Sequence, residues 1–327
     1  MTTSTIQHYP VPVASADNRA TLAHTIDQAQ TYAEASHAKN TLRGYGSDLR
    51  LFDGWCARRG LRGQPAEPQT VVLYITELAQ TLKLATIQHH LAAIAFRHRE
   101  TGLHSPVAHP MVRRTLRGIA RTIGAAKTRK SALTLDALRA LLLEIRGDGS
   151  KAKRDRAILL LGFAAALRRS EIAELIVGDV TFCTEGLRLR IRRSKTDQIG
   201  EGVELAVPSV ANRSLCAVRA VREWLDAAGL DCGPLFRAYS LQGAATDHSI
   251  DGRDVANLIK KLAARARVAG DFSGHSLRAG FATVAASAKV SLDTIARTTR
   301  HKSLAVLMTY VRPAQAFDDV ALSTMIA

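Results

Sequence analysis

The chain has 327 residues, more than a single domain usually contains, and 46% of them are hydrophobic, so it can form more than one core. Its formal net charge is +16 and its sequence pI is near 10.2, which favours a polyanionic partner such as nucleic acid. A basic membrane-binding segment is disfavoured because both halves are basic. Residues 1–125 hold 14 Lys and Arg against 8 Asp and Glu, and the remainder holds 31 against 21.

Targeting and metal-binding patterns are missing from the sequence. The first thirty residues have neither a basic n-region nor an apolar h-region, and no apolar stretch reaches the length of about 18 residues that spans a membrane. The four cysteines have no C-x-x-C spacing and no Cys/His cluster typical of zinc. We therefore expect a cytoplasmic protein with reduced thiols, no membrane partner, no cofactor and no metal.

The first half of the chain predicts a helical bundle. Residues 1–20 have no hydrophobic period and contain two prolines, so we expect a flexible tail. Residues 21–123 contain five helical patterns separated by proline and glycine, at 21–35, 40–60, 68–81, 85–102 and 109–123. The following segment 124–135, "GAAKTRKSALTL", has small residues and three cations within four positions, which predicts an exposed linker that touches phosphates.

The second half predicts a mainly α domain with a small antiparallel sheet. Leu187, Leu189 and Ile191 alternate with arginines in 186–193, the two-residue period of a half-buried strand. Residues 203–207 repeat this period, so the segment between them is expected to be a hairpin loop. Helices are expected at 134–145, 153–167, 213–227, 252–268, 275–288, 292–298, 303–311 and 317–325.

Two arginine motifs are candidates for binding an anion. Arg168 and Arg169 in "ALRRSEIAEL" lie where one helix ends and another begins, and a guanidinium there can bond two phosphate oxygens at once. His275 and Arg278 stand three residues apart at the start of the helix 275–288. The buried stripe of that helix is expected to consist of Leu277, Phe281, Val284, Ala285 and Ala288. Each motif alone is also compatible with surface or capping residues.

A tyrosine near the end of the chain needs explaining. With Ser303 as the cap of the helix 303–311, the apolar stripe is Leu304, Leu307, Met308 and Val311. Tyr310 lies about 100° away from this stripe, nine residues after His301, so it is not an obvious core residue.

Together these residues match the needs of metal-free phosphoryl transfer. Arg168, Arg278 and His301 can stabilise the charge on the non-bridging oxygens of a pentavalent phosphorane. Lys195, in the hairpin loop, or an imidazole can protonate the leaving 5′ oxygen. A tyrosine hydroxyl, ordinarily protonated at pH 7, needs a positive field and a nearby imidazole such as His275 to attack.

The order and spacing of these residues resemble the tyrosine recombinase (phage integrase) family from about residue 25 to the end. Arg168 rather than Arg169 fits the family pattern Leu-Arg-x-Ser-Glu, and the resemblance assigns Glu171 to the acidic position that braces the site. Lys195, the H-x-x-R pair His275 and Arg278, His301 and Tyr310 match the remaining positions in order. The sequence departs from the family where "FAAAL" precedes Arg168 in place of Thr-Gly-Leu.

The resemblance also implies an architecture and partners. Residues 21–123 are similar to the helical, SAM-like core-binding domain of Cre-like members, and 136–327 to the α+β catalytic domain, in which helix 317–325 is exchanged between subunits. The implied substrate is double-stranded DNA with inverted-repeat sites, bound by a homotetramer on two sites, with no small-molecule substrate. The basic residues that we expect to contact DNA are Arg43, Lys83, Arg113, Arg114, Arg117, Arg121, Lys127, Arg129, Lys130, Arg192 and Arg193.

The function that these patterns favour is a site-specific DNA recombinase that works through a 3′-phosphotyrosine, without metal or ATP. One alternative is a helix-turn-helix regulator, in which Tyr310 and His301 only contact phosphate. A second is a type IB topoisomerase, which shares the chemistry but has little sequence preference. A metal-dependent nuclease is disfavoured because carboxylates do not cluster near histidine in the sequence.

Overall fold

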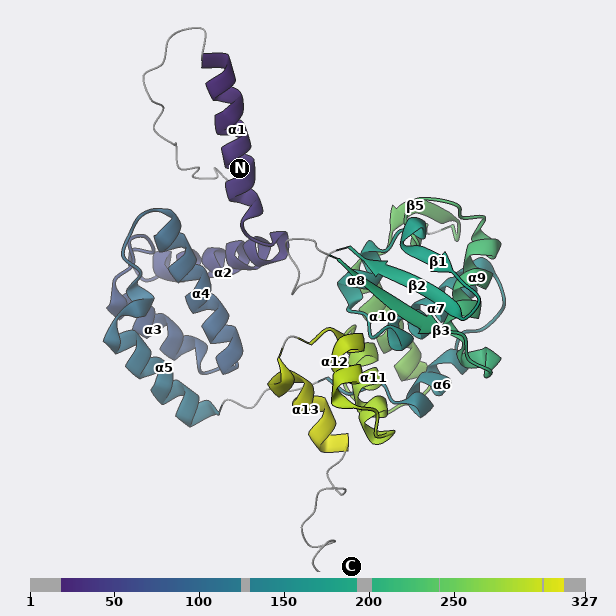
Figure 1. The fold of residues 1–327 in the computed structure, drawn as a ribbon. Coiled ribbons are helices and arrows are strands. Elements are labelled where there is room, and N and C mark those ends of the chain that lie inside the picture. Colours follow the sequence, from purple (N-terminus) through teal and green to yellow (C-terminus); the bar gives the residue numbers. More distant parts are fainter. Residues whose placement is uncertain (1–18, 125–129, 193–201, 241, 302, 315–327) are drawn as a thin grey trace, which may run out of the picture. The chain divides into compact units, whose positions relative to one another are not determined.

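The structure is a computed structural model that describes residues 19–124, 130–192, 202–240, 242–301 and 303–314. The chain divides into two compact units, residues 1–128 and 129–327 (Figure 1). Outside the described residues lie Lys127, Arg129, Arg193, Lys195, the expected helix 317–325 and residues 1–18 of the expected tail 1–20. The expected tail is wrong for residues 19 and 20, which begin the first helix. Within the described part, no helix has the length and apolarity needed to cross a membrane.

Unit 1 is a helical bundle, as predicted. Its elements are α1 (Arg19–Ala35), α2 (Lys39–Ala57), α3 (Pro68–Leu78), α4 (Leu84–Glu100), the short 3-10 helix η2 (Pro106–Ala108) and α5 (Pro110–Ile123). Pro68 and Pro110 occupy the first turns of α3 and α5, where a missing N–H costs nothing. The core includes Phe52, Tyr74 and Ile87, from α2, α3 and α4.

Unit 2 packs helices against one face of a three-stranded antiparallel sheet (Figure 1). Its helices are α6 (Leu135–Leu143), α7 (Ser150–Ala164), α8 (Arg169–Glu174), α9 (Ala217–Ala228), α10 (Gly252–Arg265), α11 (Ser276–Ser287), α12 (Leu292–Thr299) and α13 (Leu304–Ala314). Two short 3-10 helices, η3 (Val177–Asp179) and η4 (Arg213–Leu215), precede the first strand and α9. The strands are β1 (Val180–Phe182), β2 (Gly186–Ile191), β3 (Val203–Pro208), β4 (Arg237–Tyr239) and β5 (Ala245–Ser249).

The sheet confirms the predicted alternation. Leu187, Leu189 and Ile191 of β2 are buried in the core of unit 2, whereas Arg188 and Arg190 are exposed. Strand β2 pairs with β1 on one side and β3 on the other, both antiparallel. The sequence analysis missed β1 and the separate β4–β5 pair, because strands of three to five residues are too short to show a period.

The helices α11, α12 and α13 form a smaller core of their own. Leu307 and Val311 of α13 pack with alanines of α11 and with Ile295 of α12. The apolar stripe predicted for α13 is wrong at Leu304, which is 58% exposed in the first turn of that helix. The buried stripe predicted for α11 is wrong at Ala288, which follows the end of that helix and is exposed. Arg278 is buried instead, because α11 packs against α7 as well as α13 and has little free face.

The residues that precede α6 pack closely on α11. The N–H of Leu133 donates to the carbonyl of Ser276 at 3.0 Å, and the Leu133 side chain is fully buried. Lys130, on the same segment, pairs with Asp271 at 2.5 Å. A Cβ placed on Gly280 of α11 would lie 2.0 Å from the Leu133 carbonyl oxygen, so only glycine permits this approach.

We therefore expect Gly280→Ala to destabilise unit 2 by about 3 kcal/mol, because the clash is with backbone that no rotamer change can relieve. The measurement is urea-induced unfolding followed by circular dichroism. Gly46→Ala in α2 is the matched control, since nothing lies within 4 Å of its added Cβ. The control should be neutral or stabilising by about 1 kcal/mol, and equal effects at the two positions would contradict the packing described here.

Candidate active site

The site begins at the corner between α7 and α8. Helix α7 ends at Ala164, and Ala166 turns the chain with a positive φ of 47°. The carbonyl of Ala166 accepts from Arg278 Nη1 at 3.0 Å and from Arg300 Nη2 at 3.3 Å, and Arg300 Nη1 donates to the carbonyl of Ala165 at 3.2 Å. The carbonyls beyond a helix C-terminus carry partial negative charge, so this corner attracts two guanidiniums.

Glu171 joins two of the arginines of the site. As the third residue of α8 it accepts the backbone N–H of Arg168 at 2.8 Å, which caps the start of that helix. Its Oε1 accepts from Arg168 Nη1 at 2.5 Å and its Oε2 accepts from Arg300 Nη2 at 2.6 Å. The Glu171 side chain is only 1% exposed. One buried carboxylate therefore fixes the positions of Arg168 and Arg300.

The positive charge at this corner exceeds the negative charge. Arg168 and Arg278 are buried and the Arg300 side chain is only 7% exposed, and among the described residues Glu171 is the one acidic side chain bonded to any of them. Buried Nη2 of Arg278 and Nε of Arg300 have no hydrogen-bond acceptor in the described part of the chain. A buried donor without a partner is costly, so the cluster is built to receive an anion.

Burial and neighbouring charge both act on the guanidinium of Arg278. Burial, aided by nearby Arg168 and Arg300, lowers the pKa of Arg278 to about 9, although Glu171 and Tyr310 act in the opposite direction. Burial also lowers the pKa of Arg300, against the effect of Glu171. Both groups remain charged at pH 7 and provide a dry, positive surface.

His301 and Tyr310 complete the cluster. Their rings lie near each other, with centroids 5.9 Å apart and planes inclined by 30°. Burial, followed by the charges of Arg278, Arg168 and Arg300, lowers the pKa of His301 to about 4, so its imidazole is neutral at pH 7. The structure thus brings a phenol, a neutral imidazole and three guanidiniums together.

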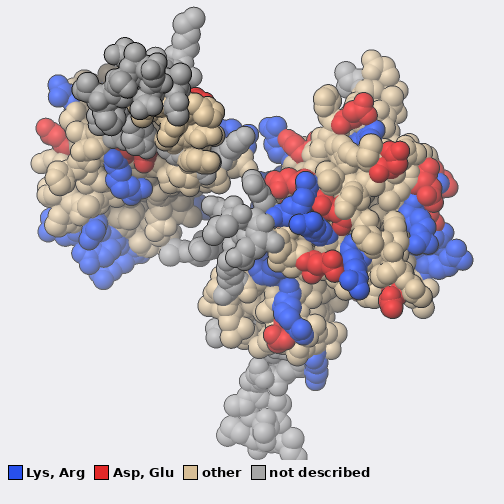
Figure 2. Space-filling model, turned by 45° about the horizontal axis from the view of Figure 1, so that its top comes forward, with Lys and Arg blue, Asp and Glu red and all other residues tan. Residues whose placement is uncertain are grey.

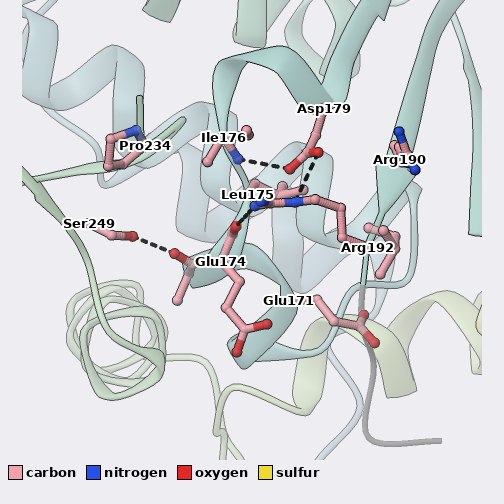
Figure 3. Close-up of a pocket in the computed structure, with 11 residues that line it drawn as sticks. Glu171, Glu174, Leu175, Ile176, Asp179, Arg190, Arg192, Pro234 and Ser249 are labelled. Atoms are coloured by element: carbon pink, nitrogen blue, oxygen red, sulfur yellow. Dashed lines mark hydrogen bonds and ion pairs between the residues drawn. The ribbon is translucent and has the colours of Figure 1, made fainter. Parts of the chain in front are cut away.

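A cavity of about 620 Å³ lies on the other side of Glu171, between α8 and β2. Figure 3 shows Arg192 turned toward Asp179 and the main chain at Glu174, apart from Glu171. Its Nε lies 3.1 Å from Asp179 Oδ1, and its Nη2 donates to the Glu174 carbonyl at 2.7 Å. Arg192, directly after β2, therefore bonds to the last residue of α8 and to Asp179 of η3, and part of its side chain stays exposed.

Helix α5 carries four of the exposed basic residues of unit 1. Arg113, Arg114, Arg117 and Arg121 are all exposed, while Val112 faces the core. Arg43 is exposed on α2 and donates to Asn40 Oδ1 at 2.9 Å, and Lys83 is exposed directly before α4. Figure 2 shows basic side chains gathered along the lower edge of this unit. Helix α5 has no acidic residue to neutralise its arginines.

Comparison with known proteins identifies the chain. Residues 131–316 match the phage integrase family, and residues 29–97 match the phage integrase N-terminal SAM-like domain. The chain belongs to the phage integrase family. It is 36% identical over 302 residues to the integrase/recombinase xerD homolog of Selenomonas ruminantium, covering 91% of this chain and 89% of the relative. It is 28% identical to recombinase cre of Escherichia phage P1, covering 93% and 91% of the two chains.

Solved structures of this tyrosine recombinase fold agree with the architecture. The XerH site-specific recombinase bound to a palindromic difH substrate has a TM-score of 0.61 at 16% identity, covering 96% of this chain and 89% of that one. Residues 75–356 of lambda integrase, as a dimer bound to a COC′ core site, have a TM-score of 0.58 at 17% identity, covering 86% and 92%. A helical SAM-like domain followed by an α+β catalytic domain is the fold of this family member.

The structure brings some of the predicted site residues together in one cluster and leaves others outside it. Arg168, Glu171, Arg278, His301 and Tyr310 of the recombinase lie in one cluster, and Arg169 is exposed. His275 is exposed at the position before α11, where its backbone N–H donates to Ser273 Oγ at 3.3 Å. Lys195 lies outside the described residues.

Arg300 was missed by the sequence analysis. Arg300 directly follows the last residue of α12 and has a φ of 54°. Glycine usually adopts this left-handed conformation after a helix. The Arg300 side chain is nonetheless 7% exposed and bonded to Glu171. The one signal in the sequence was an arginine between the end of a predicted helix and His301, which does not predict an inward-pointing side chain.

We expect Glu171→Gln to destabilise unit 2 of the recombinase by about 3 kcal/mol, because three buried guanidiniums lose their shared counter-charge. Urea-induced unfolding measures the change. Glu204→Gln is the control, since Glu204 pairs with Arg188 at 3.4 Å but is 61% exposed. Its effect should stay within about 0.5 kcal/mol, and a similar loss for both variants would refute the dependence on burial.

Proposed function

We propose that this tyrosine recombinase cleaves and rejoins DNA at specific sites, with Tyr310 as the nucleophile. The observation that carries the assignment is the excess of buried guanidiniums beside Tyr310, including an unpaired donor on Arg278. A scissile phosphodiester supplies the anion that this cluster lacks. Tyr310 Oη then forms a bond to phosphorus as the bond to the 5′ oxygen breaks, which leaves a 3′-phosphotyrosine and a free 5′-hydroxyl.

The other residues of the cluster have complementary roles in this proposal. Arg168 and Arg278 stabilise the charge that grows on the non-bridging oxygens. Glu171, itself bonded to Arg300, holds the guanidinium of Arg168 in place. Lys195 protonates the leaving 5′ oxygen. The phosphotyrosine conserves the energy of the broken bond, so attack by another 5′-hydroxyl rejoins the strands without ATP.

DNA binding by unit 1 is assigned to the arginines of α5. These four side chains are exposed, and their helix carries no acidic residue. Guanidiniums along a helix suit contacts with consecutive phosphates. The domain limits that we propose are 21–123 for this core-binding unit, 124–135 for a linker and 136–327 for the catalytic unit. The second half of that linker is not exposed as expected, because Leu133 is buried against α11 of the catalytic unit.

The assembly that we propose is a homotetramer on two inverted-repeat sites, with residues 317–325 donated to a neighbouring subunit. Oligomers on DNA are seen in solved structures of a protein with a related fold. Lambda integrase has been solved as a dimer on a core site and as a tetramer on a Holliday junction, with TM-scores of 0.58 and 0.56.

Tyr310→Phe is expected to abolish covalent adduct formation while DNA affinity changes less than about threefold, because only the attacking oxygen is lost. The probe is a duplex selected by the protein from a random-sequence pool and nicked next to the cleavage position, so that the short 5′-hydroxyl fragment diffuses away. Adducts are counted on denaturing SDS gels. A regulator would shift the duplex without an adduct. A topoisomerase would also relax supercoiled plasmids that lack the selected site.

Arg117→Gln is expected to weaken binding of the selected duplex and to reduce the slope of log affinity against log salt by about 1, because one phosphate contact is lost. Fluorescence anisotropy at several salt concentrations gives the slope. Arg139→Gln on α6 removes the same charge from another exposed arginine and should leave the slope unchanged. Equal salt slopes for the two variants would contradict a contact between α5 and the DNA phosphates.

A further inference from the structure

The hydroxyl of Thr299, the last residue of α12, has two short contacts that determine where a proton lies on His301, besides a longer one of 3.5 Å to the Ala296 carbonyl. Its Oγ1 is 2.6 Å from the carbonyl oxygen of Ile295 and 2.8 Å from Nδ1 of His301, and the residue is fully buried. A carbonyl oxygen carries no hydrogen, so the single hydroxyl hydrogen of Thr299 must lie in the first contact. Nδ1 of His301 must therefore donate in the second.

This arrangement leaves Nε2 of His301 as an acceptor. A neutral imidazole has one N–H, and here Thr299 uses it. Burial and the nearby guanidiniums lower the pKa of His301 to about 4, which keeps the ring neutral at pH 7. A phosphodiester oxygen also carries no hydrogen, so it cannot bond to Nε2 in this state. The hydroxyl of Tyr310, whose ring lies beside the imidazole, can donate to it.

We propose that Thr299 is a positioning residue that fixes the Nδ1–H tautomer of His301, and that Nε2 of His301 accepts the Tyr310 proton during cleavage. This inference rests on the proposed function. The O–H bond of Tyr310 breaks as its oxygen bonds to phosphorus, and the proton forms an imidazolium. The imidazolium can then donate to a phosphoryl oxygen. On rejoining, the departing tyrosine oxygen takes the same proton back.

The groups that face His301 explain why this transfer needs DNA. The charged groups are Arg278 from α11, Arg168 from the start of α8 and Arg300 from the end of α12, and Tyr310 faces it from α13. An imidazolium beside three guanidiniums is unfavourable in the free protein. A bound phosphate, whose negative charge grows during attack, compensates for it.

The first test is nitrogen-15 NMR of free protein with labelled histidine, in which loss of one signal pair in His301→Asn identifies the resonances. We expect Nδ1 of His301 to be protonated at pH 7. Thr299→Val should shift the ring toward the Nε2–H tautomer, whereas Thr299→Ser should restore the wild-type shifts. Thr298→Val is the matched control, because Thr298 Oγ1 makes the same kind of bond, to the Thr294 carbonyl at 2.9 Å, without contacting His301.

The second test is covalent adduct formation on the nicked duplex defined above. Thr299→Val should slow adduct formation about tenfold while DNA affinity is maintained, because the Nε2–H tautomer still donates to phosphate but no longer accepts a proton. Thr298→Val should change neither quantity. Thr299→Ala removes both contacts and replaces Thr299→Val if the latter does not fold.

The inference would be overturned by protonation of Nε2 rather than Nδ1 in the wild type, or by an altered tautomer in Thr299→Val with the wild-type rate of adduct formation. A parallel loss of affinity and rate would assign Thr299 a merely structural role and also reject it. Absence of any wild-type adduct would instead refute the proposed function, and the NMR result on free protein would still decide the tautomer.

Discussion

The site depends on the carboxylate of Glu171, which is buried between the guanidiniums of Arg168 and Arg300. Burying a charge is costly unless it is paired, and Glu171 satisfies two cations together with a backbone N–H. Within the part of the chain that the structure describes, the Arg278 side chain donates only to a neutral carbonyl, that of Ala166. The protein therefore folds with a net positive charge buried at one point. This excess reduces stability in the free protein and becomes favourable when a phosphate enters.

The position of the cluster follows from helix ends. The carbonyls that follow α7 attract cations, and the start of α8 favours an acidic residue at its third position, so charges of both signs are placed a few residues apart. The left-handed Ala166 and Arg300 turn the chain sharply at the two corners that meet here. Non-glycine residues in this conformation store strain, which the bonds of Arg300 to Glu171 and to the Ala165 and Ala166 carbonyls offset.

The sequence predicted the members of the site that match motifs of the tyrosine recombinase family. Arg168, Glu171, Arg278, His301 and Tyr310 were identified by order and motif, and the strand period of β2 was confirmed. Arg300 and Thr299 were not identified from the sequence. The inward side chain of Arg300 after a left-handed turn results from tertiary packing, as does the Thr299 hydroxyl shared between a carbonyl and an imidazole. The errors at Leu304 and Ala288 have a similar cause. A hydrophobic period assumes one buried face, whereas α11 packs against three helices, α7, α12 and α13, and the first turn of α13 is exposed at Leu304.

The same positive field has two effects that act together. In the free protein it keeps His301 neutral, and with Thr299 in place the ring can only accept a hydrogen bond at Nε2. Moving a proton onto that nitrogen adds a fourth positive charge to the cluster, which is unfavourable until a phosphodiester supplies negative charge. In the proposed mechanism, transfer of a proton from Tyr310 therefore becomes favourable only as the phosphorus is attacked. The cations that bind the substrate phosphate are then the same ones that oppose this transfer before the phosphate is bound.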